Sequence, residues 1–185
     1  MTCCARHTLC CGRTHLVYNY EVVANVLPFH VRVRIIATLI EGTSIRGTAR
    51  QTHTNKDAVM SLGLKVGLGC MRLHNQLVTG ARIKRIEVDE VWTYVGAHAK
   101  RKLPKHPAYF GDVYTFFAFD PETKLVPSYF TGKRTLTSAM HFMKDLRSRV
   151  LGKPQMSVDG WPHWIDAVRR TFGYNGVHLG CVVKE

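Results

Sequence analysis

Residues Ile83–Val95 read I-K-R-I-E-V-D-E-V-W-T-Y-V, and the interpretation of this stretch decides the fold. Val, Ile, Tyr, Trp and Thr favour a β-strand, whereas Asp and Glu are rare inside one. A carboxylate within a central strand is costly unless a cation or hydrogen bonds compensate its charge. One interpretation is an edge strand whose acids pair with the neighbouring Arg and Lys side chains. The other is that Asp89 is a metal ligand held on a rigid element.

The charge of the chain indicates its partner. The 185 residues include 26 Lys and Arg but only 13 Asp and Glu, which gives a formal net charge of +13. Such an excess is typical of proteins that bind a polyanion. No apolar run approaches the ~18–20 residues needed to cross a bilayer, and no secretory signal is recognisable. We therefore expect nucleic acid as the partner, no membrane association and a cytoplasmic location.

The first 23 residues contain four of the six cysteines, as the adjacent pairs Cys3-Cys4 and Cys10-Cys11. A zinc ribbon needs C-x2-C knuckles from two separate places, and this segment has none. We therefore expect residues 1–23 to be a poorly ordered tail. The remaining two cysteines, Cys70 and Cys181, are interpreted as buried thiols in a reducing compartment.

Residues 24–80 have helical patterning. Apolar residues recur at helical spacing from Val31 to Ile40, and Gly42 ends this first helix. Ser44 is the expected N-cap of a second helix through Arg50, and Thr54 or Asn55 that of a third. Three helices with a tight turn between the last two predict a helix-turn-helix module. His53 stands at the turn position that prefers Gly.

This module predicts a DNA-binding surface. Thr54, Asn55 and Lys56 would face the major groove at the start of the recognition helix, while Arg46 and Arg50 would contact phosphate. The competing interpretation is a small helical bundle with a solvated basic face. Further along the chain, the glycines at 63, 67 and 69 are expected to loosen the helix before a domain boundary near Thr79-Gly80.

Residues 81–185 alternate between strand and helix patterns. Three strands are followed by a helix, a strand, a helix and a strand, at 83–95, 112–120, 125–130, 135–150, 154–160, 161–172 and 176–183. Asp120 opens the turn between the second and third strands. The order β-β-β-α-β-α-β is that of the RNase H-like fold, in which the first and fourth strands lie side by side. Asp89 and Asp159 would then approach each other, and cations between them would relieve their repulsion.

A basic loop follows the first strand. Residues 97–109 include Lys100, Arg101 and Lys102, together with two prolines. We expect this loop to hold a nucleic-acid backbone near the carboxylates, the alternative being a loop that is merely well solvated.

The sequence resembles bacterial insertion-sequence transposases of the acidic-triad class, most closely the insertion sequence 1 family. Four segments carry the resemblance: Leu39–Arg46, Val88–Trp92, Gly111–Thr115 and Ser157–Gly160. It implies cleavage at the ends of the element and strand transfer into target DNA, dependent on Mg²⁺ or Mn²⁺. Asp89 and Asp159 correspond to the first two catalytic, metal-binding aspartates. The implied partner is double-stranded DNA, both terminal repeats and target, in a nucleoid-associated location.

Two departures from the family pattern shape the expected function. The family's third acid, a Glu on a helix after the fifth strand, has no counterpart, since Glu185 follows that strand immediately. The family also starts near Ala24, so residues 1–22 are interpreted as upstream sequence. We therefore expect a C-terminally truncated, catalytically incomplete transposase. The alternatives are a non-enzymatic helix-turn-helix protein that regulates transposition and a stand-alone nuclease of the same fold, and a homo-oligomer stays open.

Overall fold

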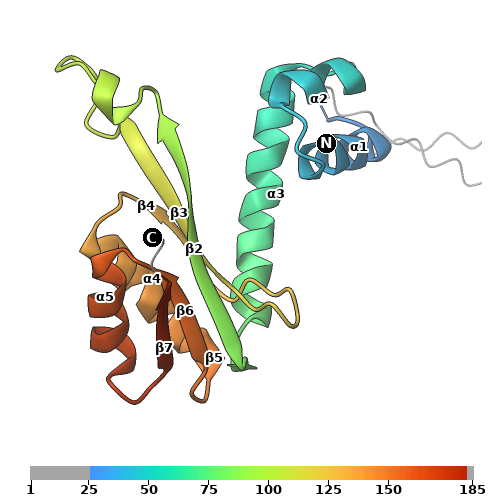
Figure 1. Ribbon diagram of the computed structural model, residues 1–185. Coiled ribbons are helices and arrows are strands. Elements are labelled where there is room, and N and C mark those ends of the chain that lie inside the picture. The colour runs from blue at the N-terminus through green and yellow to red at the C-terminus, as the bar shows by residue number, and fades with distance from the viewer. Residues whose placement is uncertain (1–25, 183–185) are drawn as a thin grey trace, which may run out of the picture. The chain divides into compact units, whose positions relative to one another are not determined.

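The computed structural model describes residues 26–182 of a mixed α/β protein (Figure 1). The chain divides into two compact units, of which the first ends at Leu68 and the second begins at Gly69. The cysteine-rich residues 1–23 lie outside the described part. Among the described residues, no helix combines the length and the apolar character needed to cross a membrane.

The first unit is built from α1 (Phe29–Ile40), α2 (Ile45–Thr52) and the first part of α3 (Lys56–Leu77). The predicted cap at Ser44 is confirmed, since its Oγ accepts a hydrogen bond from the Gly47 backbone N–H at 3.1 Å. Asn55 lies at the start of α3, where its Oδ1 accepts from the Asp57 N–H at 2.9 Å. Ile35 and Val59 are fully buried in this unit.

The connection between α2 and α3 has three residues, His53, Thr54 and Asn55, of which His53 is left-handed. His53 has φ 52° and ψ 39°, and its backbone N–H caps the end of α2. The carbonyl of Ala49 then accepts a hydrogen bond from the Thr54 N–H at 3.0 Å. The two helices are thus joined by a tight turn, as expected from the sequence.

Helix α3 corrects one sequence prediction. The three glycines of its central part do not loosen the helix, which continues without a break to Leu77. Each Gly costs roughly 1 kcal/mol relative to Ala inside a helix, an amount that tertiary contacts readily offset. Such contacts anchor its last turns: the His74 ring lies 2.9 Å from the Val126 carbonyl, and Arg149 donates to Asn75 Oδ1 at 2.6 Å.

The second unit contains a five-stranded sheet with the order β4-β3-β2-β6-β7. The strands are β2 (Arg85–Val95), β3 (Gly111–Phe119), β4 (Tyr129–Gly132), β6 (Gln155–Asp159) and β7 (His178–Val182). The first three form an antiparallel meander, and β2, β6 and β7 run parallel. The predicted succession of elements is observed, as is the pairing of the first strand with the strand that ends in Asp159. The sequence did not predict the short parallel pair β1 (Ala81–Arg82) and β5 (Val150–Leu151).

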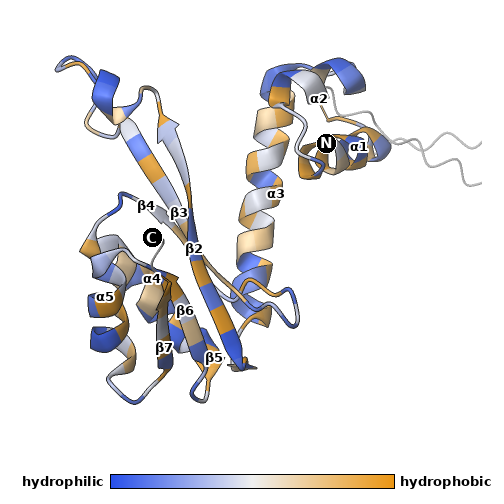
Figure 2. Ribbon diagram, viewed as in Figure 1, coloured by the Kyte–Doolittle hydropathy of each residue, from blue (hydrophilic) through white to orange (hydrophobic). Residues whose placement is uncertain are grey.

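Helices α4 (Leu136–Arg149) and α5 (Pro162–Phe172) pack on the apolar side of this sheet. Alternation along β2 buries Ile86 and Val88 while Glu87 and Asp89 stay exposed, a pattern that Figure 2 shows as alternating colours. The core includes Phe116, Phe142, Met143, Leu146, Met156 and Trp164, all fully buried. The apolar side of α4 is therefore part of the core.

The turn after β3 confirms the structural role of Asp120. Its Oδ1 accepts from the Glu122 N–H at 3.0 Å and its Oδ2 from the Thr123 hydroxyl at 2.6 Å. Burial alone would raise the pKa of Asp120, but these hydrogen bonds outweigh it and lower that pKa. The following strand begins at Tyr129 rather than Leu125. Pro127 lies between these positions and has no N–H to donate to a neighbouring strand, so regular strand pairing begins only after it.

The two cysteines in the described residues contradict the sequence interpretation. Cys70 and Cys181 are both exposed free thiols. Cys70 lies on a solvent-facing side of α3, and Cys181 lies on β7, which pairs only with β6 among the described strands. Apolar character alone does not predict burial at a sheet edge, because half of such a strand faces away from the core.

Candidate functional site

A groove of about 770 Å³ lies beside the middle of β2 and at the carboxyl end of β6 in the second unit. Its lining includes Asp89, Arg134, Asp159 and Trp161. Both aspartates named by the sequence analysis therefore line the same groove. In open α/β sheets, the carboxyl ends of parallel strands are where ligands usually bind.

The register of β2 and β6 explains how the two aspartates come together. The parallel pairing runs Arg85 with Gln155 to Glu87 with Ser157. Asp89 and Asp159 each lie two residues further along, so they continue this register and project to the same face. Asp159 Oδ1 also accepts a hydrogen bond from the Trp161 N–H at 3.2 Å, which fixes the carboxylate at the start of the loop before α5.

Arg134 is the member of the site that the sequence analysis missed. Its Nε donates to Glu90 Oε1, and its Nη2 lies 3.6 Å from Asp159 Oδ2. The guanidinium also lies 4.6 Å from the centre of the Trp161 ring. Arg134 is 44 residues from Glu90 in sequence and stands in a turn, so only the folded sheet reveals the pairing. The sequence feature that could have drawn attention to Arg134 is its position directly before Thr135, the N-cap of α4.

Glu90 also contributes to this site, although alternation along β2 points its side chain to the face opposite that of Asp89. Its side chain is 12% exposed, and its Oε2 is buried without a hydrogen-bond partner in the described structure. Burial raises the pKa of Glu90, and the charges of Asp159 and Asp89 add to this, while Arg134 offsets part of the effect. Three carboxylates and one guanidinium thus share one electrostatic environment.

The carboxylate oxygens at this groove are of the kind that binds a hard divalent cation. Carboxylate oxygens are the ligands that Mg²⁺ and Mn²⁺ prefer, and an unpartnered buried oxygen of Glu90 adjoins the pair. Within residues 26–182, however, no group of three or more His, Cys, Asp and Glu side chains converges in a geometry that could hold a metal. Asp89 and Asp159 are the two groove carboxylates that could contribute to holding a metal ion.

The residues predicted to bind DNA in the first unit divide into two kinds. Arg46, Arg50 and Lys56 are exposed and form no ion pair with another described residue. The two shorter side chains have local roles, since the Thr54 hydroxyl lies 2.8 Å from that of Thr52 and Asn55 caps α3. A cap of this kind leaves the Asn55 amide nitrogen available for another partner.

The basic loop lies at the far end of β2 from the acids. Lys100 and Arg101 belong to the short 3-10 helix η1 (Ala99–Arg101) and are exposed. Lys102 donates from Nζ to the Ala108 carbonyl at 2.9 Å, within the loop itself. Since Asp89 and Val95 are six residues apart on an extended strand, the loop begins ~20 Å from the aspartate.

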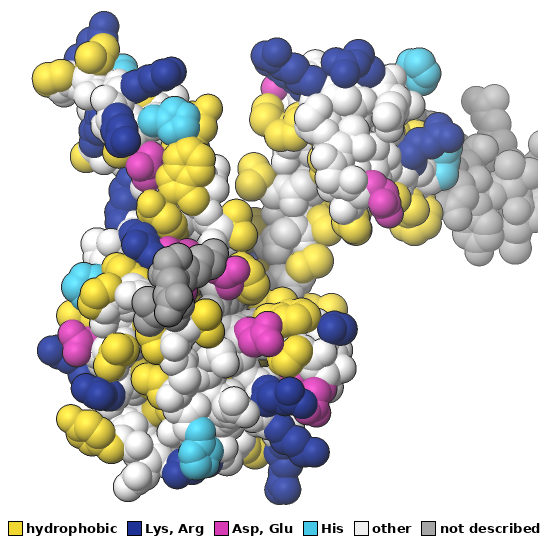
Figure 3. Space-filling model, viewed as in Figure 1, with side chains coloured by type: hydrophobic (Ala, Val, Ile, Leu, Met, Phe, Trp, Pro, Cys, Tyr) yellow, Lys and Arg dark blue, Asp and Glu magenta, His cyan; other side chains and the backbone are white. Residues whose placement is uncertain are grey.

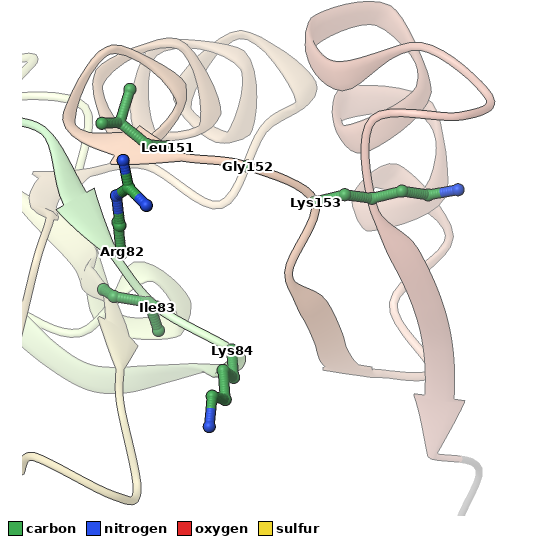
Figure 4. Close-up of a pocket in the computed structure, with 6 residues that line it drawn as sticks. All are labelled: Arg82, Ile83, Lys84, Leu151, Gly152 and Lys153. Carbon is green, nitrogen blue, oxygen red and sulfur yellow. The ribbon is translucent and has the colours of Figure 1, made fainter.

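A second hollow, of about 530 Å³, adjoins the β1–β5 pair (Figure 4). Arg82, Lys84 and Lys153 contribute its cations. In Figure 4 these three side chains extend in different directions, so they do not form a common binding point.

Comparison with known proteins gives structural similarity only. No protein-family model matches the chain, and no curated protein matches it. The crystal structure of the Mos1 strand transfer complex aligns with 80% of this chain at 15% identity and a TM-score of 0.36. The cryo-EM structure of the piggyBac transposase synaptic complex with hairpin DNA aligns with 83% at 13% identity and a TM-score of 0.42. The Mos1 transposase paired-end complex with the left transposon end aligns with 80% at 15% identity and a TM-score of 0.32.

The chain spans 56%, 40% and 57% of the lengths of these three solved chains, in the same order. The low TM-scores leave the assignment of the site to the geometry of this chain.

Proposed function

We propose that this chain is a DNA-processing protein of the transposase type, in which Asp89 and Asp159 hold a divalent metal ion. The observation that carries the proposal is the placement of the two aspartates in one register on adjoining parallel strands, at one groove. Carboxylates brought together in this way repel each other unless a cation lies near them. Bound there, Mg²⁺ or Mn²⁺ would supply Lewis-acid activation for phosphoryl transfer.

The surrounding residues position the acids. Arg134 contacts both Glu90 and Asp159, and the Trp161 N–H holds the other oxygen of Asp159. Both contacts restrict the rotation of the Asp159 side chain. A carboxylate held by packing and hydrogen bonds is what a catalytic metal site requires.

The first unit supports DNA binding by a helix-turn-helix. Helix α2, the left-handed His53 and the start of α3 follow one another as in that motif. Arg46 and Arg50 are one turn apart on α2, so both project from one side of the helix toward a shared partner. The proposed partner is double-stranded DNA. The assignment to bacterial insertion-sequence transposases of the insertion sequence 1 family, and with it an RNase H-like catalytic domain, rests on the four sequence segments given above.

A second candidate function is a DNA-binding regulator without catalytic activity. The observation that favours it is that the described acids offer a pair of metal ligands and no converging group of three. Two-metal phosphoryl transfer places its ions ~3.5–4 Å apart and normally needs more ligands than one pair of aspartates provides.

The test is divalent-dependent nicking of a supercoiled plasmid by the full chain. Because the described acids offer one pair of metal ligands and no converging group of three, we expect nicking with Mn²⁺ or Mg²⁺ to be slow. It should fall by roughly a further hundredfold or more in Asp89→Asn and Asp159→Asn, since the metal contributes several kcal/mol to such reactions. The matched control is Asp166→Asn, because Asp166 is an exposed acid on α5 outside the groove lining. Duplex binding without nicking would establish the regulator instead, and nicking that survives both substitutions would exclude the proposed site.

A further inference from the structure

Strands β2 and β3 continue as a two-stranded ribbon beyond the rest of their sheet (Figure 1). Strand β6 pairs with β2 only as far as Glu87, and β4 pairs with β3 only from Tyr114 to Phe117. The last three ladder positions, from Thr93 with Val113 to Val95 with Gly111, therefore have no further neighbour among the described strands. A ribbon of this kind exposes both faces.

The ribbon carries a contiguous aromatic surface made by Trp92, Tyr94 and His98, here called the aromatic platform. The His98 ring stacks on Tyr94 with centroids 3.9 Å apart and on Trp92 with centroids 5.2 Å apart. Trp92 and Tyr94 are each 47% exposed. Large aromatic rings that are half exposed on a projecting ribbon are typical of a binding surface rather than of a core.

The loop that joins the two strands is strongly basic and contains no acid. Between Ala97 and Phe110 the sequence has no Asp or Glu. It has four cations, all exposed: Lys100, Arg101, Lys102 and Lys105. Figure 3 shows Lys and Arg side chains gathered with hydrophobic and His side chains at this tip. Aromatic faces beside unpaired cations match the chemistry of bases beside phosphates.

The tip has a defined shape. Gly96 has φ +69°, and the Phe110 ring lies where the Cβ of any other residue would project. Asp112 accepts a hydrogen bond from the Ala99 N–H through its Oδ1 at 3.0 Å, and its carbonyl accepts from Lys133 Nζ at 2.8 Å. These contacts fix the backbone of the loop that carries the four cations.

We propose that the aromatic platform stacks on unpaired bases of a DNA strand, while the loop cations contact the phosphates of the same strand. This inference rests on the proposed DNA-processing function and adds a binding element to it. Trp92 is three residues from Asp89, ~10 Å along the strand, so it points to the opposite face of β2, the face of Glu90. Arg134 contacts Glu90 and also lines the groove, so one DNA molecule that passes Arg134 can reach both the groove and the platform. Stacking needs a base that has left the duplex stack, because the faces of paired bases are covered by the neighbouring base pairs.

The test compares two DNA duplexes of the same sequence, one fully paired and one with a three-nucleotide unpaired segment containing 2-aminopurine. We expect the full chain to bind the unpaired duplex about tenfold more tightly and to quench the 2-aminopurine fluorescence, as stacking on aromatic side chains does. Trp92→Leu/Tyr94→Leu should abolish the preference and the quenching but leave the affinity for the paired duplex unchanged. Tyr174→Leu is the matched control, since Tyr174 is an exposed aromatic beside Arg169 on another surface of the unit.

The outcomes separate this inference from the proposed function. Tight binding of the paired duplex with no preference and no quenching in the wild-type chain overturns the platform alone. A double variant that keeps the preference overturns it as well. Absence of binding to either duplex overturns both. Because quenching is measured on the wild-type chain, the result does not depend on the folding of the variants.

Discussion

At the scale of single residues, Arg134 connects acids that are distant in sequence. Its two contacts place one positive charge between Glu90 on β2 and Asp159 on β6. The ion pair is partly buried, with Arg134 33% and Glu90 12% exposed. Pairs of this kind gain Coulomb energy but lose hydration, so their net contribution depends on geometry.

Glu90 gives a pH-dependent prediction. Its pKa is raised above the ordinary 4.5, chiefly by burial, so the folded state binds its proton more tightly than the unfolded state does. The stability that the protonated form provides is complete below the unfolded pKa and is lost as the pH rises through the folded pKa. Glu90→Gln stays neutral throughout. We therefore expect it to match the wild type near pH 4 and to have a larger free energy of unfolding at pH 7.

Urea unfolding at the two pH values measures this difference. Glu87→Gln is the control, because Glu87 is an exposed acid on the same strand, and we expect its effect to stay within about 0.5 kcal/mol. A Glu90→Gln protein that is less stable than the wild type at pH 7 would show that the Arg134 pair outweighs the cost of burial.

At the scale of elements, the turn between α2 and α3 requires a backbone conformation that disfavours the residue found there, His53. His53 adopts φ 52°, a left-handed conformation that costs an L-residue roughly 1–2 kcal/mol. Its side chain is exposed and makes no hydrogen bond among the described residues. Among the described residues, no side-chain hydrogen bond of His53 offsets this local strain.

His53→Gly should stabilise the first unit. Gly relieves the left-handed strain but loses more conformational entropy on folding, which leaves an expected gain of about 0.5–1 kcal/mol. Thermal unfolding followed by far-UV circular dichroism measures it. Gln51→Gly, inside α2, is the counterpart and should destabilise by about 1 kcal/mol. If the two substitutions changed the stability equally, the left-handed conformation of His53 would not be a source of strain.

Elements were predictable where local chemistry determines them. The Ser44 cap, the Asp120 turn and the alternation of Ile86 and Val88 were readable from sequence, because each depends on neighbours a few residues away. The continuity of α3 was not, since its glycines argue against a helix and its anchors lie at Val126 and Arg149. The pairing of Arg134 with Glu90 escaped prediction for the same reason.

At the scale of the whole molecule, charge is the dominant property. The net charge of +13 is distributed over both units, while the groove gathers several of the few acids. Nucleic-acid binding of this kind is salt-dependent, because each phosphate contact releases a condensed counterion.

Arg46→Ala/Arg50→Ala should weaken duplex binding and reduce the slope of log affinity against log salt by about two, one for each lost phosphate contact. Titration of a fluorescent duplex at several salt concentrations measures the slope. Arg34→Ala/Lys65→Ala removes the same charge from the first unit but outside α2, and should change the slope less. Identical slopes for the two double variants would assign the effect to net charge alone and exclude a specific contact by α2.

The exposure of Cys181 has a practical consequence for spectroscopy. Its Sγ donates a hydrogen bond to the Asp159 carbonyl at 3.3 Å, so a thiol natural to the chain lies beside a proposed metal ligand. With the other five cysteines replaced by Ser, a nitroxide attached there would sit within the short range over which Mn²⁺ broadens its signal. Occupancy of the groove could then be followed as a magnetic signal, with no cysteine added to the chain.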